Sequence, residues 1–305
     1  MSSPALICAI VLHWRTPGLT TRCVESLAAL DRCDTLFRLR VLVVDNGSGD
    51  VPDFSSCSGL SVETISLTRN LGYAGGNNVG LRRAWDAGAT WALLLNSDVV
   101  LAPDCLVELL RVASVDHRIG IVGPLVLRES QPDRIQSNGQ RFGRWTARHT
   151  EIDRGGLATS IDTAPHIVDA VSGCALMVRR ELADSVGPLD EQFFLYFEDL
   201  DWCLRARRSG FGVMCIPAAR VWHRGGASIG RSSPRTTLYS VRNHLALAVR
   251  ATGWRRGQLT WPLIVAYHAA YILANRQQWT LAHVRALVHG VFHGVAGRLG
   301  EEPSI

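Results

Sequence analysis

The first 127 residues alternate between short apolar runs and segments with helical spacing, and this alternation limits the folds open to the chain. The runs are rich in Val, Ile and Leu, as in parallel strands that helices cover on both faces. They occupy residues 5–12, 40–44, 62–67, 90–95 and 119–127, and helical spacing is found at residues 19–30, 78–87 and about 103–113. Strands that alternate with helices predict an α/β fold whose central sheet is mostly parallel and flanked by helices.

The pattern changes after Arg128. Residues 129–165 are polar, rich in Gly and Arg and weakly periodic, so we expect an excursion or hairpin that lies over a site. Strand character returns at residues 168–178, 212–216 and 220–223, and helical character at 198–209 and from about 236 to about 299. We therefore expect an α/β domain over residues 1–235, with halves at about 1–127 and 128–235, and a C-terminal helical region over residues 236–305.

The chain contains no lysine, so all 32 of its Lys and Arg residues are arginines. A P-loop needs the lysine of its Gly-Lys-Ser/Thr element, and protein kinases and Schiff-base enzymes need a lysine amine. These three classes are excluded. The net charge of +5 suits a phosphate-bearing ligand, nucleic acid or an anionic membrane surface. Because no cluster of arginines is interleaved with aromatic residues, we do not expect nucleic acid as a partner.

The cysteines and the apolar segments indicate a cytoplasmic location. Eight cysteines are spread along the chain without a Cys-x-x-Cys pair, which is typical of reduced thiols. The N-terminal apolar run lacks a basic leader and a cleavage site, so we expect a buried strand and no signal peptide. Residues 261–274 form the longest apolar stretch and are too short to span a bilayer. This stretch has arginines on both sides and carries Trp and Tyr, so two alternatives remain open: contact with the inner face of the plasma membrane, or packing on the α/β domain.

Polar residues follow three of the predicted strands at their carboxyl ends, where open α/β sheets bind ligands. Asp45 and Asn46 open the first cluster, in which a carboxylate can accept hydrogen bonds from a base or ribose, or simply form a turn. Asn96 and Asp98 belong to the third cluster, in which a carboxylate can hold a hard divalent cation.

The second cluster, residues 69–80, contains four glycines and three asparagines. Glycines permit close backbone approach to a ligand, and the segment leads into a helix N-terminus, which favours anions. It does not match Gly-x-Gly-x-x-Gly and follows the third strand, so a dinucleotide fingerprint is a poor interpretation. A plain glycine-rich turn remains the alternative.

Three acids, Glu198, Asp199 and Asp201, follow an aromatic run at the start of a predicted helix. The helix dipole stabilises acids in a first turn, and Asp201 can pair with Arg205, so a structural role is open and is the one we expect for Asp201. Crowded carboxylates beside aromatic rings also raise one pKa, which yields a base for a hydroxyl proton. His223, at a strand end before a glycine-rich loop, is a candidate metal ligand.

The order of these motifs resembles glycosyltransferase family 2, the inverting enzymes with a GT-A fold, and in particular its rhamnosyltransferase-like bacterial members. The resemblance covers roughly residues 5–250. It rests on six motifs in the family's order: Asp45-Asn46, residues 70–78, Asn96-Ser97-Asp98, residues 172–175, residues 194–202 and His223.

The resemblance implies a nucleotide-diphospho-sugar half at about 1–127 and an acceptor half at about 128–235. It implies that Asp199 is the catalytic base, with Glu198 as its neighbour or substitute, and that Asp98 and His223 hold a divalent cation, Mg²⁺ or Mn²⁺. Asn96 stands where many relatives have an acid, which weakens the expectation of a strict metal requirement. The expected donor-binding residues are Asp45 at the nucleobase, Asn46, Asn70, Gly72, Gly76, Asn77 and Asn96, to which we add Arg231 as a guanidinium that could close over the diphosphate.

The expected function is therefore transfer of a sugar, with rhamnose from dTDP-rhamnose as the first candidate, to a hydroxyl of a glycan or lipid-linked acceptor. Two alternatives stay open: a non-catalytic nucleotide-sugar-binding relative and a sugar nucleotidyltransferase, although the latter usually relies on an early glycine-rich loop and a lysine. A hydrolase is excluded. Residues 226–230 match a nucleophile elbow, but no Asp follows Ser228, and the only later Glu residues lie beyond the last His.

Overall fold

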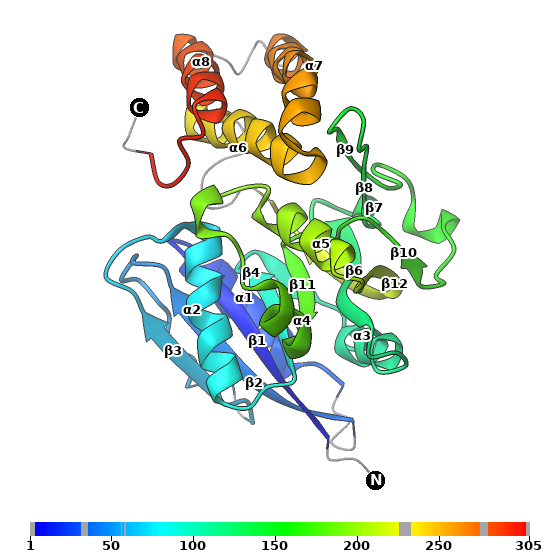
Figure 1. The fold of residues 1–305 in the computed structure, drawn as a ribbon. Coiled ribbons are helices and arrows are strands. Elements are labelled where there is room, and N and C mark those ends of the chain that lie inside the picture. The colour runs from blue at the N-terminus through cyan, green and yellow to red at the C-terminus, as the bar shows by residue number, and fades with distance from the viewer. Residues whose placement is uncertain are drawn as a thin grey trace.

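The computed structural model describes residues 4–31, 36–55, 57, 59–225, 233–274 and 280–302 (Figure 1). It confirms the α/β prediction, because a central sheet is flanked by helices on both faces. The strands of this sheet follow the order β10-β12-β6-β11-β4-β1-β2-β3, with β5 paired to β12 and β7 to β6. Their bounds are β1 Ala5–His13, β2 Phe37–Asp45, β3 Val62–Ser66, β4 Trp91–Asn96, β5 Val99–Leu101, β6 Ile119–Arg128, β7 Gln131–Ser137, β10 His166–Ile167, β11 Ala175–Arg179 and β12 Gly212–His223.

The sheet is mostly parallel, as predicted, but it also contains antiparallel strands. Strands β3, β2, β1 and β4 are parallel, and β6 and β12 form a second parallel pair. Between these two groups, β11 runs antiparallel to both β4 and β6. A helical crossover returns the chain in the same direction, whereas β11 is reached through the polar excursion at residues 129–174 and enters in the opposite direction.

Two predicted strand segments differ from the structure. The apolar residues from 168 to 174 are largely buried, but β11 begins only at Ala175. The apolar residues in this segment are therefore explained by burial and not by pairing in the sheet. The two short pieces at 212–216 and 220–223 belong to one strand, β12, whose register on β6 shifts between Ile216 and Arg220. The polar excursion does form a hairpin, β8 (Gln140–Phe142) with β9 (His149–Glu151).

Side chains that alternate along the strands bury two separate apolar layers. Ile7, Ala9 and Val11 of β1 pack with helices α1 (Pro17–Ala28) and α3 (Cys105–Ala113). Cys8 and Ile10 face the opposite layer. That layer contains α2 (Gly72–Asp86), α4 (Arg180–Val186) and α5 (Glu198–Arg208). Two short 3₁₀ turns occupy Ala158–Ser160 and Glu191–Phe193.

Three helices form the C-terminal end of the described chain: α6 (Pro234–Thr252), α7 (Trp254–Ala274) and α8 (Leu281–Val295). Figure 1 shows α6 nearest the sheet domain, with α7 and α8 above it. None of the helices in the described ranges is both long enough and apolar enough to cross a bilayer.

Helix α2 begins at Gly72 and not at residue 78, so most of the glycine-rich cluster is helical. A Cβ on Gly76 would lie 2.5 Å from Leu12 Cδ1, and a Cβ on Gly80 would lie 2.4 Å from Ile10 Cγ2. These glycines therefore bring α2 close to β1. Glycines can allow either close helix packing or close approach to a ligand. In this structure, Gly76 and Gly80 allow α2 to pack closely on β1.

Gly72 is constrained in two ways, by a φ of +74° and by contact with Phe194, whose carbonyl oxygen would lie 2.3 Å from an added Cβ. We expect Gly72→Ala to lower the free energy of unfolding in urea by about 3 kcal/mol, from left-handed strain and overpacking together. Gly88→Ala is the matched control, because Gly88 has a φ of +79° and nothing within 4 Å of an added Cβ. It should cost about 1 kcal/mol. Equal losses in the two variants would contradict the overpacking at Gly72.

Candidate functional site

A cavity of about 460 Å³ lies between the start of α5, the β8–β9 hairpin and helices α6 and α7. Asn96 and His223 line one part of it, and Glu198 and Asp199 another. These four residues are separated by up to 127 positions in the sequence, and all four were predicted to belong to the site. Of the predicted catalytic and metal-binding residues, only Asp98 does not line the cavity. Its carboxylate contacts His223, which does line it.

Asp199 lies at the start of α5, and two backbone amides hold its carboxylate, one from α5 itself and one from the segment before β11. Gly173 N donates to Oδ2 at 2.7 Å and Leu200 N donates to Oδ1 at 2.8 Å. Burial raises the pKa of Asp199 above its usual range despite these hydrogen bonds. Burial and the neighbouring Asp199 also raise the pKa of Glu198 well above its ordinary value. Both carboxylates are therefore more basic than ordinary Asp and Glu side chains, which is the direction that suits a proton acceptor.

Asp201, the third acid of this helix turn, has the structural role expected for it. Its Oδ2 accepts a hydrogen bond from Arg205 Nε at 2.8 Å, and the side chain is 3% exposed. It does not line the cavity.

Residues 172–175 connect the two parts of the site. Asn96 N donates to the carbonyl of Cys174 at 2.9 Å, and the next residue back, Gly173, donates to Asp199. A Cβ on Gly173 would lie 2.8 Å from Asp199 Oδ2, so only glycine allows this approach. The motif fixes the distance between the end of β4 and the carboxylate.

The turn before α5 is strained. Phe194, Tyr196 and Phe197 have φ values of 61°, 71° and 74°, which non-glycine residues rarely adopt. Asn243 of α6 is fully buried, and its Nδ2 donates to the carbonyls of Phe193, Leu195 and Tyr196 at 2.8 to 2.9 Å. Helix α6 thus holds the turn that delivers Glu198 and Asp199 to the cavity.

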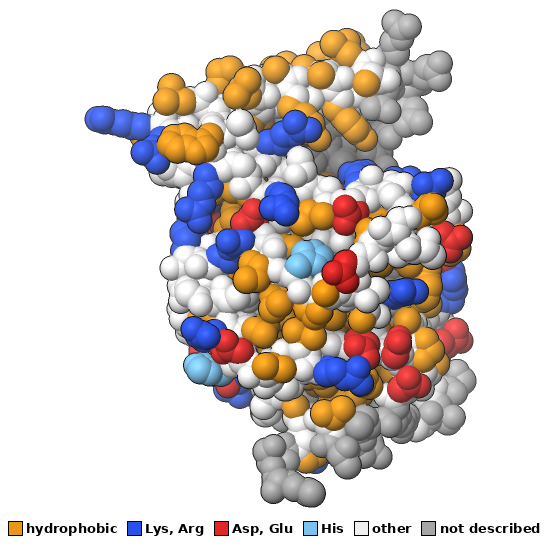
Figure 2. Space-filling model, turned by 90° about the vertical axis from the view of Figure 1, so that its right-hand side faces the viewer, with side chains coloured by type: hydrophobic (Ala, Val, Ile, Leu, Met, Phe, Trp, Pro, Cys, Tyr) orange, Lys and Arg blue, Asp and Glu red, His pale blue; other side chains and the backbone are white. Residues whose placement is uncertain are grey.

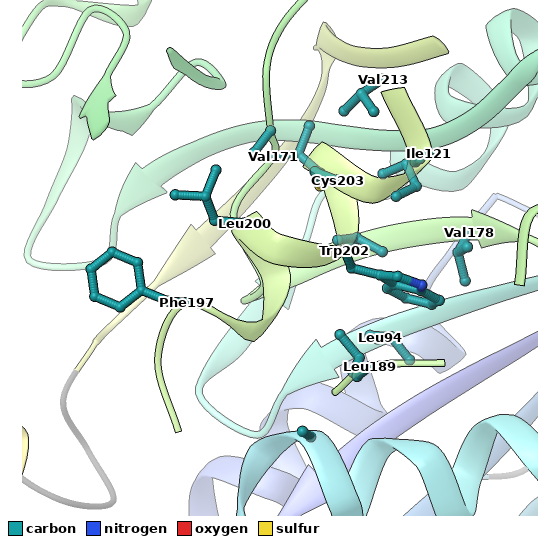
Figure 3. Close-up of a cluster of buried hydrophobic side chains, with 14 of the residues drawn as sticks. Leu94, Ile121, Val171, Val178, Leu189, Phe197, Leu200, Trp202, Cys203 and Val213 are labelled. Atoms are coloured by element: carbon teal, nitrogen blue, oxygen red, sulfur yellow. The ribbon is translucent and has the colours of Figure 1, made fainter. Parts of the chain in front are cut away.

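The core side of α5 anchors the same helix (Figure 3). Leu200, Trp202 and Cys203 pack with buried side chains from β4, β6, β11 and β12. Trp202 Nε1 also donates to the carbonyl of Gly187 at 2.8 Å. Because these contacts fix the helix against the sheet, its first turn has a defined position at the cavity.

Asp98 and His223 form the second charged part of the site. His223 Nε2 lies 3.2 Å from Asp98 Oδ1 and 3.5 Å from Asn96 Nδ2, and Gln136 Nε2 lies 2.8 Å from the other ring nitrogen. Burial lowers the pKa of His223, but Cys174 and Asp98 outweigh burial and raise it to about 10. Burial raises the pKa of Asp98, but hydrogen bonds from His223 and Gly225 outweigh that effect and lower it.

This donor set fits a divalent cation in part. The Asp98 carboxylate and the His223 imidazole lie 3.2 Å apart, and carboxylate oxygens and imidazole nitrogens are ligands of divalent cations. Asn96 presents its amide nitrogen to the same ring at 3.5 Å. Within the described ranges, no group of three His, Cys, Asp or Glu could hold a cation by itself. The residues therefore fit an ion whose coordination phosphate oxygens complete.

Apart from Asn96, the predicted donor-binding residues in the described ranges lie outside the cavity lining. Asp45 ends β2, two strands from Asn96 along the same edge, which is roughly 10 Å. Burial raises its pKa, but hydrogen bonds from Ser48 and Gly49 more than offset this and lower it. Asp45 lies at the carboxyl edge of the parallel strands, where α/β sheets bind ligands, but it is only 1% exposed. Its hydrogen bonds with Ser48 and Gly49 form the turn anticipated as an alternative.

The asparagines predicted for donor binding make internal hydrogen bonds. Asn46 Nδ2 donates to Asn70 Oδ1 and to the carbonyl of Gly72, both at 3.0 Å, and Asn46 Oδ1 accepts from Leu71 N at 2.8 Å. Asn77 is fully buried and donates to the carbonyl of Tyr73. Arg231 lies outside the described residues.

Several polar residues of the cavity wall were not predicted from the sequence. Gln140, His149 and Glu151 belong to the β8–β9 hairpin, and each has a buried side-chain atom without a hydrogen-bond partner among the described residues. Glu198 Oε2 is a fourth such atom in the cavity. The polar composition of residues 129–165 indicated a covering segment, but nothing in it distinguished these three positions. Nothing in the sequence indicated that Asn243 holds the turn before α5.

Comparisons with known proteins identify the family of the chain. Residues 4–246 match the family described as "Glycosyltransferase like family 2". An N-acetylglucosaminyl-diphospho-decaprenol L-rhamnosyltransferase of Mycobacterium tuberculosis is 29% identical over 249 residues, which cover 73% of this chain and 79% of the relative. The dTDP-rhamnosyl transferase RfbF of Shigella flexneri is 25% identical over 280 residues, which cover 84% of this chain and 87% of the relative.

A solved structure supports the fold. The mannosyltransferase PcManGT from Pyrobaculum calidifontis, in complex with GDP-Man and Mn²⁺, superimposes with a TM-score of 0.58 at 15% identity, covering 96% of this chain and 87% of its own. The family match spans the whole sheet domain and both parts of the cavity. The chain therefore belongs to glycosyltransferase family 2, has its GT-A fold, and is a glycosyltransferase.

Proposed function

We propose that the protein is an inverting glycosyltransferase that moves a sugar from a nucleotide-diphospho-sugar to a hydroxyl of a glycan or lipid-linked acceptor. The observation that carries the proposal is the cavity in which Asp199, with its raised pKa, shares one space with Asn96 and His223. The names of two relatives favour dTDP-rhamnose as the donor and a diphospho-polyprenol-linked sugar as the acceptor.

Asp199 would act as the general base. Its Oδ2 and Oδ1 accept hydrogen bonds from Gly173 N and Leu200 N, so the carboxylate keeps its orientation when a substrate enters. An acceptor hydroxyl in contact with this carboxylate loses its proton as the oxygen forms a bond to the anomeric carbon. The nucleoside diphosphate leaves from the opposite face, which inverts the configuration.

Asp98 and His223 would hold a divalent cation, with the amide of Asn96 beside them. When bound, the cation supplies positive charge that neutralises the diphosphate leaving group. Gln136 fixes the imidazole of His223 through its other ring nitrogen. Asn96 adds no charge, so the diphosphate must provide more of the coordination than it would beside a second acid.

The β8–β9 hairpin would bind the hydroxyls of the acceptor. Burial lowers the pKa of His149 to about 4 and raises that of Glu151, so the first is neutral and the second is a strong hydrogen-bond acceptor. Their unpaired atoms and that of Gln140 line the cavity, where sugar hydroxyls can satisfy them.

A screen of dTDP-, UDP- and GDP-sugars by thermal shift, each with and without Mg²⁺ or Mn²⁺, tests this function. We expect dTDP-rhamnose to raise the melting temperature, and to do so more strongly with metal, because a ligand stabilises the folded state that binds it. Turnover with a polyprenyl-diphospho-sugar should follow. A stabilising donor without turnover would support a non-catalytic binding protein. Synthesis of a nucleotide-sugar from a nucleoside triphosphate and a sugar 1-phosphate would support a nucleotidyltransferase.

We also propose that the enzyme works in the cytoplasm at the inner face of the plasma membrane, with its C-terminal helices in contact with the lipid. A lipid-linked acceptor would require this arrangement, since its polyprenyl chain stays in the bilayer.

A further inference from the structure

The outward faces of α7 and α8 form a continuous apolar surface. Among the described residues, sixteen large hydrophobic side chains are exposed, and eleven of them belong to these two helices. From Leu259 to Ala274, every exposed position of α7 carries an apolar side chain or a tyrosine. On α8, the exposed apolar positions recur at helical spacing in a single stripe: Leu281, Val284, Val288, Phe292 and Val295. A patch of this extent marks an interaction surface.

Helices α7 and α8 carry arginines and no acid, and the two acids that follow α8, Glu301 and Glu302, are paired with basic side chains. The sequence contains no Asp or Glu between Asp201 and Glu301. Arg255, Arg256, Arg285 and Arg298 are exposed on or beside the two helices. Figure 2 shows the hydrophobic side chains at the top of the molecule with basic side chains beside them, and acidic side chains only lower down in that view. Trp145 extends the surface from a neighbouring loop, where Arg256 lies over its ring at 5.2 Å.

The apolar side chains and the arginines together indicate which partner this surface binds. Apolar side chains, tyrosine and tryptophan at the rim, and arginine without acids are the features of a helix that lies in an anionic lipid interface. A second copy of the chain would bring arginine against arginine, and the nearby Glu301 and Glu302 are already paired with basic side chains, which opposes self-association.

The catalytic cavity reaches the same surface. Tyr267 and Tyr271 line the cavity and are 46% and 52% exposed on the outward face of α7. The wall of the cavity is therefore continuous with the apolar surface. A molecule anchored in lipid below α7 could extend its head group into the cavity without leaving the bilayer.

We propose that α7 and α8 lie on an anionic bilayer through these apolar faces and, if the proposed function holds, open the cavity toward a lipid-linked acceptor. The bilayer contact itself depends only on the helices. It is peripheral, because no helix in the described ranges is suited to span the membrane. Electrostatic attraction contributes to it, so binding weakens as salt screens the arginines.

Vesicle flotation of the full-length protein tests the contact. We expect binding to phosphatidylcholine vesicles that contain about one quarter phosphatidylglycerol, and weaker binding to phosphatidylcholine alone. Raising the salt from about 0.1 M to about 1 M shortens the Debye length from about 10 Å to about 3 Å and should reduce binding. Leu263→Glu/Val288→Glu places charge on both faces, at positions that are each 59% exposed, and should weaken binding at least tenfold.

The matched control is Val115→Glu/Ile167→Glu. It makes the same chemical change at two exposed positions, 81% and 70% exposed, away from α7 and α8, and should bind vesicles like the unmodified chain. Failure of the unmodified chain to bind anionic vesicles would overturn the proposal, as would equal binding by both double variants. A doubled mass in light scattering that Leu263→Glu/Val288→Glu abolishes would assign the surface to a second copy and overturn it as well.

The same samples separate this proposal from the proposed function. None of the four substituted positions lines the cavity, so the thermal shift with dTDP-rhamnose should be unchanged in both double variants. Vesicle binding without any donor shift would leave the membrane surface standing and remove the donor assignment. A thermal shift with dTDP-rhamnose but no vesicle binding would support the donor assignment and remove the membrane surface.

Discussion

Asp199→Asn should reduce kcat by about 10²- to 10⁴-fold, because the amide can accept a hydrogen bond but cannot take a proton. The substitution preserves shape, so an Oδ atom remains to accept from Gly173 N or Leu200 N. Donor affinity should change little, since the carboxylate faces the acceptor hydroxyl. Steady-state kinetics combined with isothermal titration of the donor would separate the two effects.

Asp201→Asn is the matched control for this variant. Asp201 belongs to the same helix turn, but it is buried, pairs with Arg205 and does not line the cavity. We expect this variant to lose stability while the rate per folded molecule remains. Substantial turnover by folded Asp199→Asn would overturn the assignment of the base.

The pH profile of the unmodified enzyme provides a second readout for Asp199. Only the deprotonated carboxylate can accept the proton, so the rate should rise with pH through the pKa of this group. Burial raises that pKa above the ordinary 3.8 of an aspartate, and the acid limb should therefore lie above pH 3.8. A rate that stays constant down to that pH would be inconsistent with a buried base.

The sequence identified four residues that share the cavity, but it did not identify the hairpin residues of the cavity wall. Motif order brought Asn96, Glu198, Asp199 and His223 into one proposal, and the fold places all four in one cavity. The alternation of apolar runs with helices predicted the parallel strands whose ends carry Asp45 and Asn96. Both inferences depend on local patterns, which a sequence displays directly.

The remaining features depend on contacts between distant segments. Glycines at positions 76 and 80 satisfy the requirements of a ligand loop and of close helix packing equally, and only the partner atoms on β1 decide between them. Asn46 was predicted to bind the donor, yet its amide hydrogens go to Asn70 and Gly72. Asn243 meets three carbonyls about 47 to 50 residues away, and no periodicity marks such a contact.

Asp98→Asn should weaken donor binding at least tenfold in the presence of Mn²⁺ and leave it nearly unchanged in EDTA. The substitution removes one negative charge from the pair with His223, while the amide oxygen can still accept from Gly225 N. Loss of the charge reduces affinity for a hard cation, whose binding depends on carboxylate charge more than on shape. Titration of the donor in Mn²⁺ and in EDTA, for the unmodified protein and for Asp98→Asn, measures how much the metal raises donor affinity in each.

Because donor affinity is compared both in Mn²⁺ and in EDTA, a folding defect cannot produce the expected result. A misfolded variant would lose donor binding in EDTA as well as in Mn²⁺, whereas loss of a cation ligand changes only the second measurement. Asp104→Asn, at an exposed position after β5, is the control for a change in net charge alone and should behave like the unmodified chain. If EDTA leaves both the rate and the donor affinity of the unmodified enzyme unchanged, the cation is not needed. Asp98 and His223 would then act as an ion pair that orders the end of β12 beside Asn96, and neutralisation of the diphosphate would fall to arginines.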